Sequence, residues 1–279
     1  LVPVITTAAF CFWVEGVMAL IVGNAALMMM LPHAIITVSI ITALLPTLSR
    51  RSHDHDRQGF GTDVADAARW VVALLTPCAA LLALTGPALG VILYGHGASD
   101  VSQGIEVGKT AAIFAIGLPG FSMFYLLLRT YYAQENTRTP FFINLGFNVT
   151  HLAIGVTAFM VVAPPHKVMA LAAGYSVAYL ITSALTWRRV VSRLPALQQA
   201  GIGNFTARTL AAVSGASVAG WLAHYVVLRG FDGGVLVGAV LDAGITATVF
   251  TATYVVLAGT GHVLDLQQLR GFLRSDRND

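Results

Sequence analysis

The sequence predicts an all-α membrane protein, a polytopic bundle of about eight transmembrane helices. Apolar residues make up 56% of the chain, charged residues make up only 10%, and the mean hydropathy is +0.75. Soluble domains carry about 25% charged residues, so this composition cannot give a protein of this length a charged, water-facing exterior. Stretches of roughly 20 apolar residues recur along the chain, and a helix of that length crosses the hydrocarbon of a bilayer.

Eight apolar stretches are long enough to span a membrane. Only Gly23 and Asn24 separate the first two, so the choice of eight spans rather than seven depends on a break there. Pro32 lies within the second stretch, and Pro119 and Gly120 interrupt the fourth. Because an interior proline removes one helical hydrogen bond, these positions predict helix kinks. The stretches cover residues 3–22, 25–47, 67–87, 108–128, 141–162, 167–187, 208–228 and 235–257.

The remaining segments are short or polar. We expect the helix bundle to occupy residues 1–258 and a cytoplasmic, juxtamembrane amphipathic tail to follow at 259–279. The polar segment 49–63 is expected to be a solvated loop, and its sequence HDHD at 53–56 is a weak metal motif in such a loop. Residues 88–97 are too few to cross a bilayer and are expected to form an interfacial piece on the outer face.

Basic residues are concentrated in alternate connections of the chain. Only Lys109, Lys167 and Arg229, of 16 Lys and Arg residues, lie in the connections after the odd-numbered spans. Positively charged connections are retained in the cytoplasm, so the sequence predicts an even number of spans with both termini cytoplasmic. The thirteen residues on the predicted cytoplasmic side are Arg50, Arg51, Arg57, Arg69, Arg129, Arg138, Arg188, Arg189, Arg193, Arg208, Arg270, Arg274 and Arg277.

Several polar residues fall inside the apolar stretches. Glu15 lies deep in the first and Asp242 about one-third of the way into the eighth, and a charge buried in lipid costs about 2–3 kcal/mol or more. A hydrated path through the bundle would explain them, and so would interhelical hydrogen bonds worth under about 1 kcal/mol each. The larger penalty favours a cavity or an ion pair for Glu15. The other candidates are Asn24, His33, Asn144, Asn148, His151 and His224.

No catalytic motif is present in the sequence. It contains no GxSxG, HExxH or phosphate-binding-loop pattern, so we expect a protein that is not an enzyme. Cys11 and Cys78 lie in apolar runs and are expected to be small buried hydrophobic residues. We therefore expect no metal site, no cofactor and no nucleic-acid partner.

Residues 117–148 contain Tyr131-Tyr132-Ala133, Glu135-Asn136 and Thr137-Arg138-Thr139-Pro140. With these motifs the segment resembles one of the MurJ (MviN) lipid II flippases, and residues 31–51 and 88–100 resemble two further segments of that family in the same order. The family fold has fourteen spans in two lobes, and this chain is similar to spans seven to fourteen. The N-terminal lobe of the same protein is therefore an expected partner. Family members commonly carry an arginine where this chain has Leu27, so that cation cannot be carried over.

The resemblance implies a function in the bacterial cytoplasmic membrane. A flippase of this family moves lipid II, whose headgroup is linked to undecaprenyl pyrophosphate, from the cytoplasmic to the outer leaflet by alternating access. The expected partners are this polyprenyl-linked lipid and the membrane lipids. The alternatives are a drug or polysaccharide exporter of the same superfamily, a membrane-embedded glycosyltransferase, or a scaffold that recruits cell-wall enzymes.

Arg129 and Arg138 flank the short turn before Pro140. One hypothesis makes the junction 129–140 a gating element on the cytoplasmic face, with a guanidinium gripping an oxyanion or a carbonyl cluster. The alternative is that both arginines only anchor the turn among anionic lipid headgroups, where each basic residue is worth about 1 kcal/mol.

Overall fold

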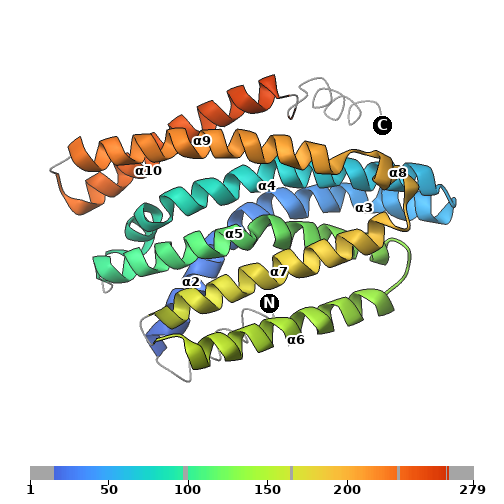
Figure 1. Cartoon of the computed structure of the whole chain (residues 1–279), viewed down its shortest axis with the longest axis horizontal. Coiled ribbons are helices and arrows are strands. Elements are labelled where there is room, and N and C mark those ends of the chain that lie inside the picture. The colour runs from blue at the N-terminus through green and yellow to red at the C-terminus, as the bar shows by residue number, and fades with distance from the viewer. Residues whose placement is uncertain (1–15, 97–99, 164–165, 231–232, 262, 264–279) are drawn as a thin grey trace.

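The molecule is a bundle of long helices (Figure 1), and the predicted all-α class is confirmed. A computed structural model describes residues 16–96, 100–163, 166–230, 233–261 and 263. The helices are α2 (Gly16–Pro32), the π-helix η1 (His33–Thr37), α3 (Val38–His53), α4 (Arg57–Tyr94), α5 (Val101–Tyr132), α6 (Arg138–Val161), α7 (Lys167–Val191), the short α8 (Pro195–Gln199), α9 (Ile202–Gly230) and α10 (Val235–Thr260).

Within the described residues, seven helices are long and apolar enough to cross a membrane. Most of the first expected span, residues 3–15, lies outside the described part of the chain. The break expected at Gly23 and Asn24 is wrong, because α2 runs through both residues and continues into η1 and α3. A glycine inside a helix costs only about 1 kcal/mol relative to alanine, and the apolar residues on both sides favour continuation of the helix.

Two further predictions about connections are wrong. Residues 88–94 do not form a separate interfacial piece, because they continue α4 to Tyr94. The segment 49–63 is not a loop, because α3 extends to His53 and α4 begins at Arg57. The segment is polar because it comprises the ends of two helices that extend beyond their apolar stretches. Hydropathy alone does not distinguish such a polar helix end from a loop.

The predicted kink positions differ in their local structure. Immediately after Pro32 the helix changes from α to π geometry over His33–Thr37, the kind of insertion that bends helices. The helix α5 continues through Pro119 and Gly120 without a break. A Cβ placed on Gly120 would lie 3.2 Å from the Cα of Leu180, so this glycine allows α7 to approach α5 closely.

The helices α4 and α5 cross closely near the end of α4 and the start of α5. Gly86 and Gly90 on α4 face Gly104 and Gly108 on α5, and each pair has the spacing of the GxxxG motif. A Cβ on Gly90 would lie 2.1 Å from the carbonyl oxygen of Gly104. Any side chain here would therefore push the two backbones apart.

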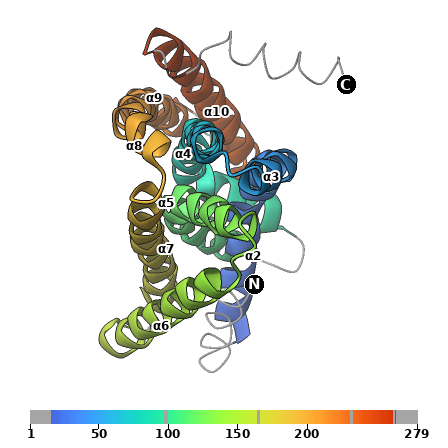
Figure 2. The same ribbon diagram turned by 90° about the vertical axis from the view of Figure 1, so that its right-hand side faces the viewer.

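The other helices are arranged around this pair (Figure 2). Helix α6 lies at one edge of the bundle and the hairpin of α9 and α10 lies at the opposite edge, against α4. The hydroxyl of Tyr254 on α10 donates a hydrogen bond of 2.6 Å to the carbonyl of Ala73 on α4. Between α5, α6 and α7 the core is aromatic and includes Phe114, Phe121, Phe124, Phe147, Tyr175 and Tyr179.

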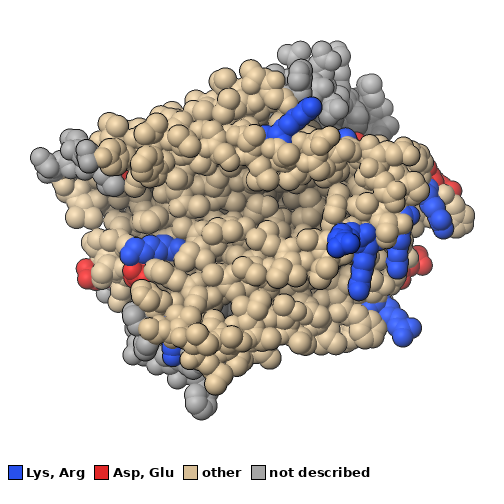
Figure 3. Space-filling view, in the orientation of Figure 1, with Lys and Arg blue, Asp and Glu red and all other residues tan. Residues whose placement is uncertain are grey.

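Most of the described arginines lie at one end of the bundle, where α3, α5 and α7 end and α4, α6 and α9 begin. Lys and Arg side chains gather at the right-hand end of Figure 3. At the other end, Lys109 forms an ion pair of 2.9 Å with Glu106. We call the first of these the arginine-rich end.

Candidate functional site

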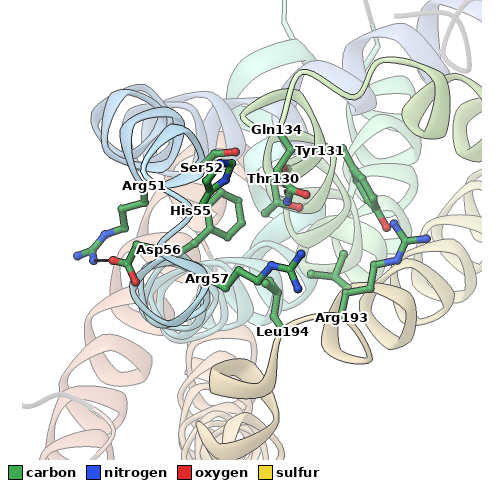
Figure 4. A pocket seen from close by; sticks show the side chains of 12 residues that line it. Arg51, Ser52, His55, Asp56, Arg57, Thr130, Tyr131, Gln134, Arg193 and Leu194 are labelled. Atoms are coloured by element: carbon green, nitrogen blue, oxygen red, sulfur yellow. Dashed lines mark hydrogen bonds and ion pairs between the residues drawn. The ribbon is translucent and has the colours of Figure 1, made fainter.

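A cavity of about 580 Å³ opens at the arginine-rich end (Figure 4). Its walls come from the end of α3, the start of α4, the end of α5 and the end of α7. Segments far apart in the sequence therefore meet around one space. The residues that line it are Arg51, Ser52, His55, Asp56, Arg57, Phe60, Thr130, Tyr131, Gln134, Val190, Arg193 and Leu194.

The turn between α3 and α4 is held by Asp56. Its Oδ1 accepts a hydrogen bond of 2.8 Å from the backbone N–H of Gly59 and so caps the first turn of α4. Its Oδ2 accepts a bond of 2.7 Å from Nη1 of Arg51. The hydrogen bond from Gly59, followed by the bond from Arg51, lowers the pKa of Asp56 below its ordinary value. The turn is thus an ordered wall of the cavity.

The three arginines of the cavity differ in their partners. Arg51 is balanced by two carboxylates, because its Nε lies 2.6 Å from Oδ2 of Asp63 in addition to the bond with Asp56. Arg57 and Arg193 have no acidic partner among the residues that the structure describes. In Figure 4 the side chains of Arg57 and Arg193 extend into the space between the helices, whereas Arg51 turns away towards Asp56.

Tyr131 supplies a buried hydroxyl to the same cavity. The residue is only 3% exposed, and within the described part of the chain its Oη has no hydrogen-bond partner. Its hydroxyl end points towards Arg193 in Figure 4. A buried polar group without a partner costs about 1–3 kcal/mol, so an acceptor that enters the cavity would satisfy it.

These groups together suit an oxyanion. Two guanidinium groups offer planar pairs of N–H donors, and the phenol on α5 offers a third donor. Hydrogen bonds from charged donors to phosphate oxygens are roughly twice as strong as those between neutral groups. The cavity can therefore bind a phosphate or pyrophosphate group.

The residues of the sequence motif build the turn beside the cavity. The side chain of Asn136 accepts a bond of 3.0 Å from the N–H of Thr139 and donates one of 3.0 Å to its hydroxyl. Pro140 lies in the first turn of α6, where proline is tolerated. Thr137 precedes α6. Ala133 is buried after the end of α5, and Tyr132 is 39% exposed.

The two gating candidates do not line the cavity. Arg129 donates a hydrogen bond to the hydroxyl of Tyr125, and its guanidinium lies 4.7 Å from the centre of that ring. Arg138 lies 5.9 Å from the ring centre of Phe142. Both are held by aromatic rings next to the turn, so their role in gating stays a prediction.

The polar candidates within the spans do not share one site. Glu15 lies outside the described residues, and Asn24 is half-buried on α2. His33 is buried in η1, with its Nδ1 3.0 Å from the hydroxyl of Ser122 on α5. Asp242 is buried on α10 and pairs with His224 on α9. Asn144 and Asn148 each donate to a carbonyl of their own helix, and His151 stacks on Phe147.

Sequence reasoning missed Arg57 and Arg193 as site residues and counted them only as markers of orientation. It named Tyr131 only as part of a motif. A local count of charges would have singled out Arg193, because no acidic residue lies between Glu135 and Asp232 in the sequence. It would not have singled out Arg57, which directly follows Asp56.

A bundle of long apolar helices with an arginine-lined cavity at one end defines a polytopic membrane protein. The family model "Lipid II flippase MurJ" matches residues 3–241. The chain belongs to this family.

Individual relatives agree with the family assignment. The chain is 27% identical over 160 residues to a probable lipid II flippase MurJ of Rhizobium meliloti, covering 57% of this chain and 30% of that one. It is 23% identical over 246 residues to the Vibrio cholerae protein of the same description, covering 88% of this chain and 44% of that one. The chain thus spans less than half the length of these curated relatives.

A solved structure has the same fold. A lipid II flippase MurJ in an inward closed conformation matches with a TM-score of 0.63 at 17% identity, covering 88% of this chain and 49% of that one. The match extends over most of this chain but only about half of the solved one.

Proposed function

We propose that this chain forms one lobe of a lipid II flippase and that its cavity receives the pyrophosphate of the lipid-linked precursor. The observation that carries the proposal is the meeting of Arg57 and Arg193 with the hydroxyl of Tyr131 in one cavity, where none of the three has a partner within the described residues. A pyrophosphate brings several acceptor oxygens and a negative charge that complement these donors.

The proposal includes an orientation. The chain lies in the bacterial cytoplasmic membrane, with the arginine-rich end and both termini on the cytoplasmic side. The support is the concentration of arginine at one end of the bundle, because positive residues are retained in the cytoplasm. The cavity then opens where a precursor made in the cytoplasm first meets the protein.

The proposed activity is transport and not a chemical reaction. The headgroup crosses the membrane while its polyprenyl chain stays in the bilayer, and no covalent bond is broken. Alternating access requires two bundles that move against each other, so this lobe acts together with a further lobe of the same protein. The exposed apolar stripe of α2 and η1, which includes Leu20, Leu27, Leu31 and Ile35, is a surface that such a lobe can cover.

Binding of lipid II tests the proposal. The double variant Arg57→Gln/Arg193→Gln should bind lipid II at least tenfold more weakly, because a hydrogen bond to a charged group is worth about 1.5–3 kcal/mol. The matched control is Arg189→Gln, which removes an exposed arginine at the same end that does not line the cavity.

Two results would contradict the proposal. The first is unchanged affinity in a double variant that folds like the wild type. The second is displacement of lipid II by an equal amount of phosphatidylglycerol, because the cavity would then be a site for ordinary anionic phospholipid.

A further inference from the structure

A second polar cluster lies at the other end of the bundle, in the hairpin of α9 and α10. The Nδ1 of His224 on α9 lies 2.6 Å from Oδ1 of Asp242 on α10. The hydroxyl of Thr246, one turn further along α10, donates to the same oxygen at 3.3 Å. Asp242 is 5% exposed, whereas the His224 side chain is 30% exposed. The pair therefore joins α9 to α10.

This cluster forms part of the wall of its own cavity. The space has a volume of about 380 Å³ and is bounded by the connection at Gly233 and Gly234 as well as by His224 and Asp242. Asp242 is seven residues beyond the start of α10, which places it about 10 Å along the helix from that connection. The cavity therefore leads from the end of the hairpin to the polar pair.

The surroundings of the pair are apolar on every helix that contributes to the cavity. Helix α4 presents Pro87, Ala88 and Val91, and α5 presents Ile105. Glu106, next to Ile105, is paired with Lys109. Among the described residues that line this cavity, His224 and Asp242 are the only titratable groups.

We propose that His224 and Asp242 form a proton-binding site that is reached from the end of the bundle opposite the arginines. With a neutral imidazole that donates from Nδ1 to the carboxylate, the pair carries one negative charge. A proton that binds Nε2 gives an imidazolium–carboxylate pair with no net charge, and the Nδ1 bond is retained. An apolar environment disfavours the net negative charge of the pair, and this favours binding of a proton.

The proposed site has a consequence for the packing of the hairpin. Loss of the proton leaves a net negative charge between α9 and α10, which draws water into the cavity and weakens the contact between the two helices. Binding of a proton at one end of the lobe thereby biases the position of the hairpin against α4. This inference does not depend on the ligand proposed for the arginine cavity.

The test is a titration of histidine in the full chain. The protein is labelled with ¹³C-histidine, placed in lipid nanodiscs and followed by NMR between about pH 5 and 9, the range in which histidine ordinarily changes charge. The chain has eight histidines, and one of their titrating signals should be absent in His224→Gln, which assigns it to His224. In Asp242→Asn its midpoint should fall by at least one pH unit, a tenfold weaker affinity for the proton, because the carboxylate no longer stabilises the imidazolium.

Two further variants keep the result interpretable. Thr246→Val removes the hydroxyl that donates to the carboxylate and partly neutralises it, so the variant should raise the midpoint, and it does so even if Asp242→Asn does not fold. Glu106→Gln removes an exposed carboxylate near the same end and should leave the midpoint unchanged. A His224 signal that keeps one protonation state throughout the range would overturn the proposal and leave a structural hydrogen bond. A midpoint unchanged by both Asp242→Asn and Thr246→Val would also overturn it.

Discussion

The substitution Tyr131→Phe distinguishes the effect of this buried hydroxyl on protein stability from its effect on ligand binding. In the unliganded protein the Oη of Tyr131 has no partner within the described residues, although the side chain is only 3% exposed. An unsatisfied buried polar group costs about 1–3 kcal/mol, so its removal should leave the protein as stable as the wild type or more stable by up to that amount. The same removal takes one donor away from the cavity.

Binding should therefore change in the opposite direction from stability. A hydrogen bond to a charged acceptor is worth about 1.5–3 kcal/mol, so Tyr131→Phe should weaken binding of lipid II roughly tenfold to 150-fold. Thermal unfolding in detergent measures the first effect and a lipid II titration measures the second. Tyr132→Phe is the matched control, because Tyr132 is 39% exposed and does not line the cavity. A Tyr131→Phe variant that is less stable than the wild type, or that binds lipid II equally well, would refute the reasoning.

Three other predictions concern the crossing of α4 and α5, the turn at Asp56 and the turn before α6. Gly90→Ala should destabilise the protein by about 1–3 kcal/mol, because the added Cβ meets the backbone of α5, whereas Gly244→Ala on α10 meets nothing within 4 Å and should not; chemical unfolding compares them. The lowered pKa of Asp56 means that its stabilising contribution is present above the ordinary pKa of aspartate and is lost as the pH falls through the folded value. Asp56→Asn, which still caps α4, should therefore flatten the acid limb of the unfolding temperature measured against pH. Arg138→Lys should preserve expression but lower lipid export if its guanidinium acts in gating, and full export by both Arg138→Lys and Arg138→Gln would leave only membrane anchoring.

Hydropathy and charge were sufficient to predict the class of fold and the end at which the arginines gather. Both depend on averages over about 20 residues, which the sequence contains directly. The break at Gly23 and Asn24 could not be predicted correctly, because a single weak helix former does not decide whether a long apolar helix continues. The ordered turn at 54–56 depends on Arg51 bonding two aspartates across that turn, a contact that polarity alone does not indicate.

The cavity could not be predicted from the sequence, for a different reason. Arg57, Tyr131 and Arg193 are far apart from one another in the sequence, and only the packing of α4, α5 and α7 brings them to one space. The pairing of His224 with Asp242 required the register of α9 against α10. Both residues were candidates on their own, but their partnership came from the structure.

The central claim is that this lobe takes part in moving lipid II by means of its arginine cavity. The direct measurement is translocation of fluorescent lipid II in vesicles by a protein that contains this lobe and its partner lobe. The account predicts rapid transfer by the wild type and by Arg189→Gln, and transfer slowed at least tenfold by Arg57→Gln/Arg193→Gln. Transfer by a well-folded double variant at the wild-type rate would contradict the role of the cavity. Lipid II that stays on its original leaflet with the wild type, while the same protein still supports cell-wall synthesis in cells, would instead indicate a scaffold.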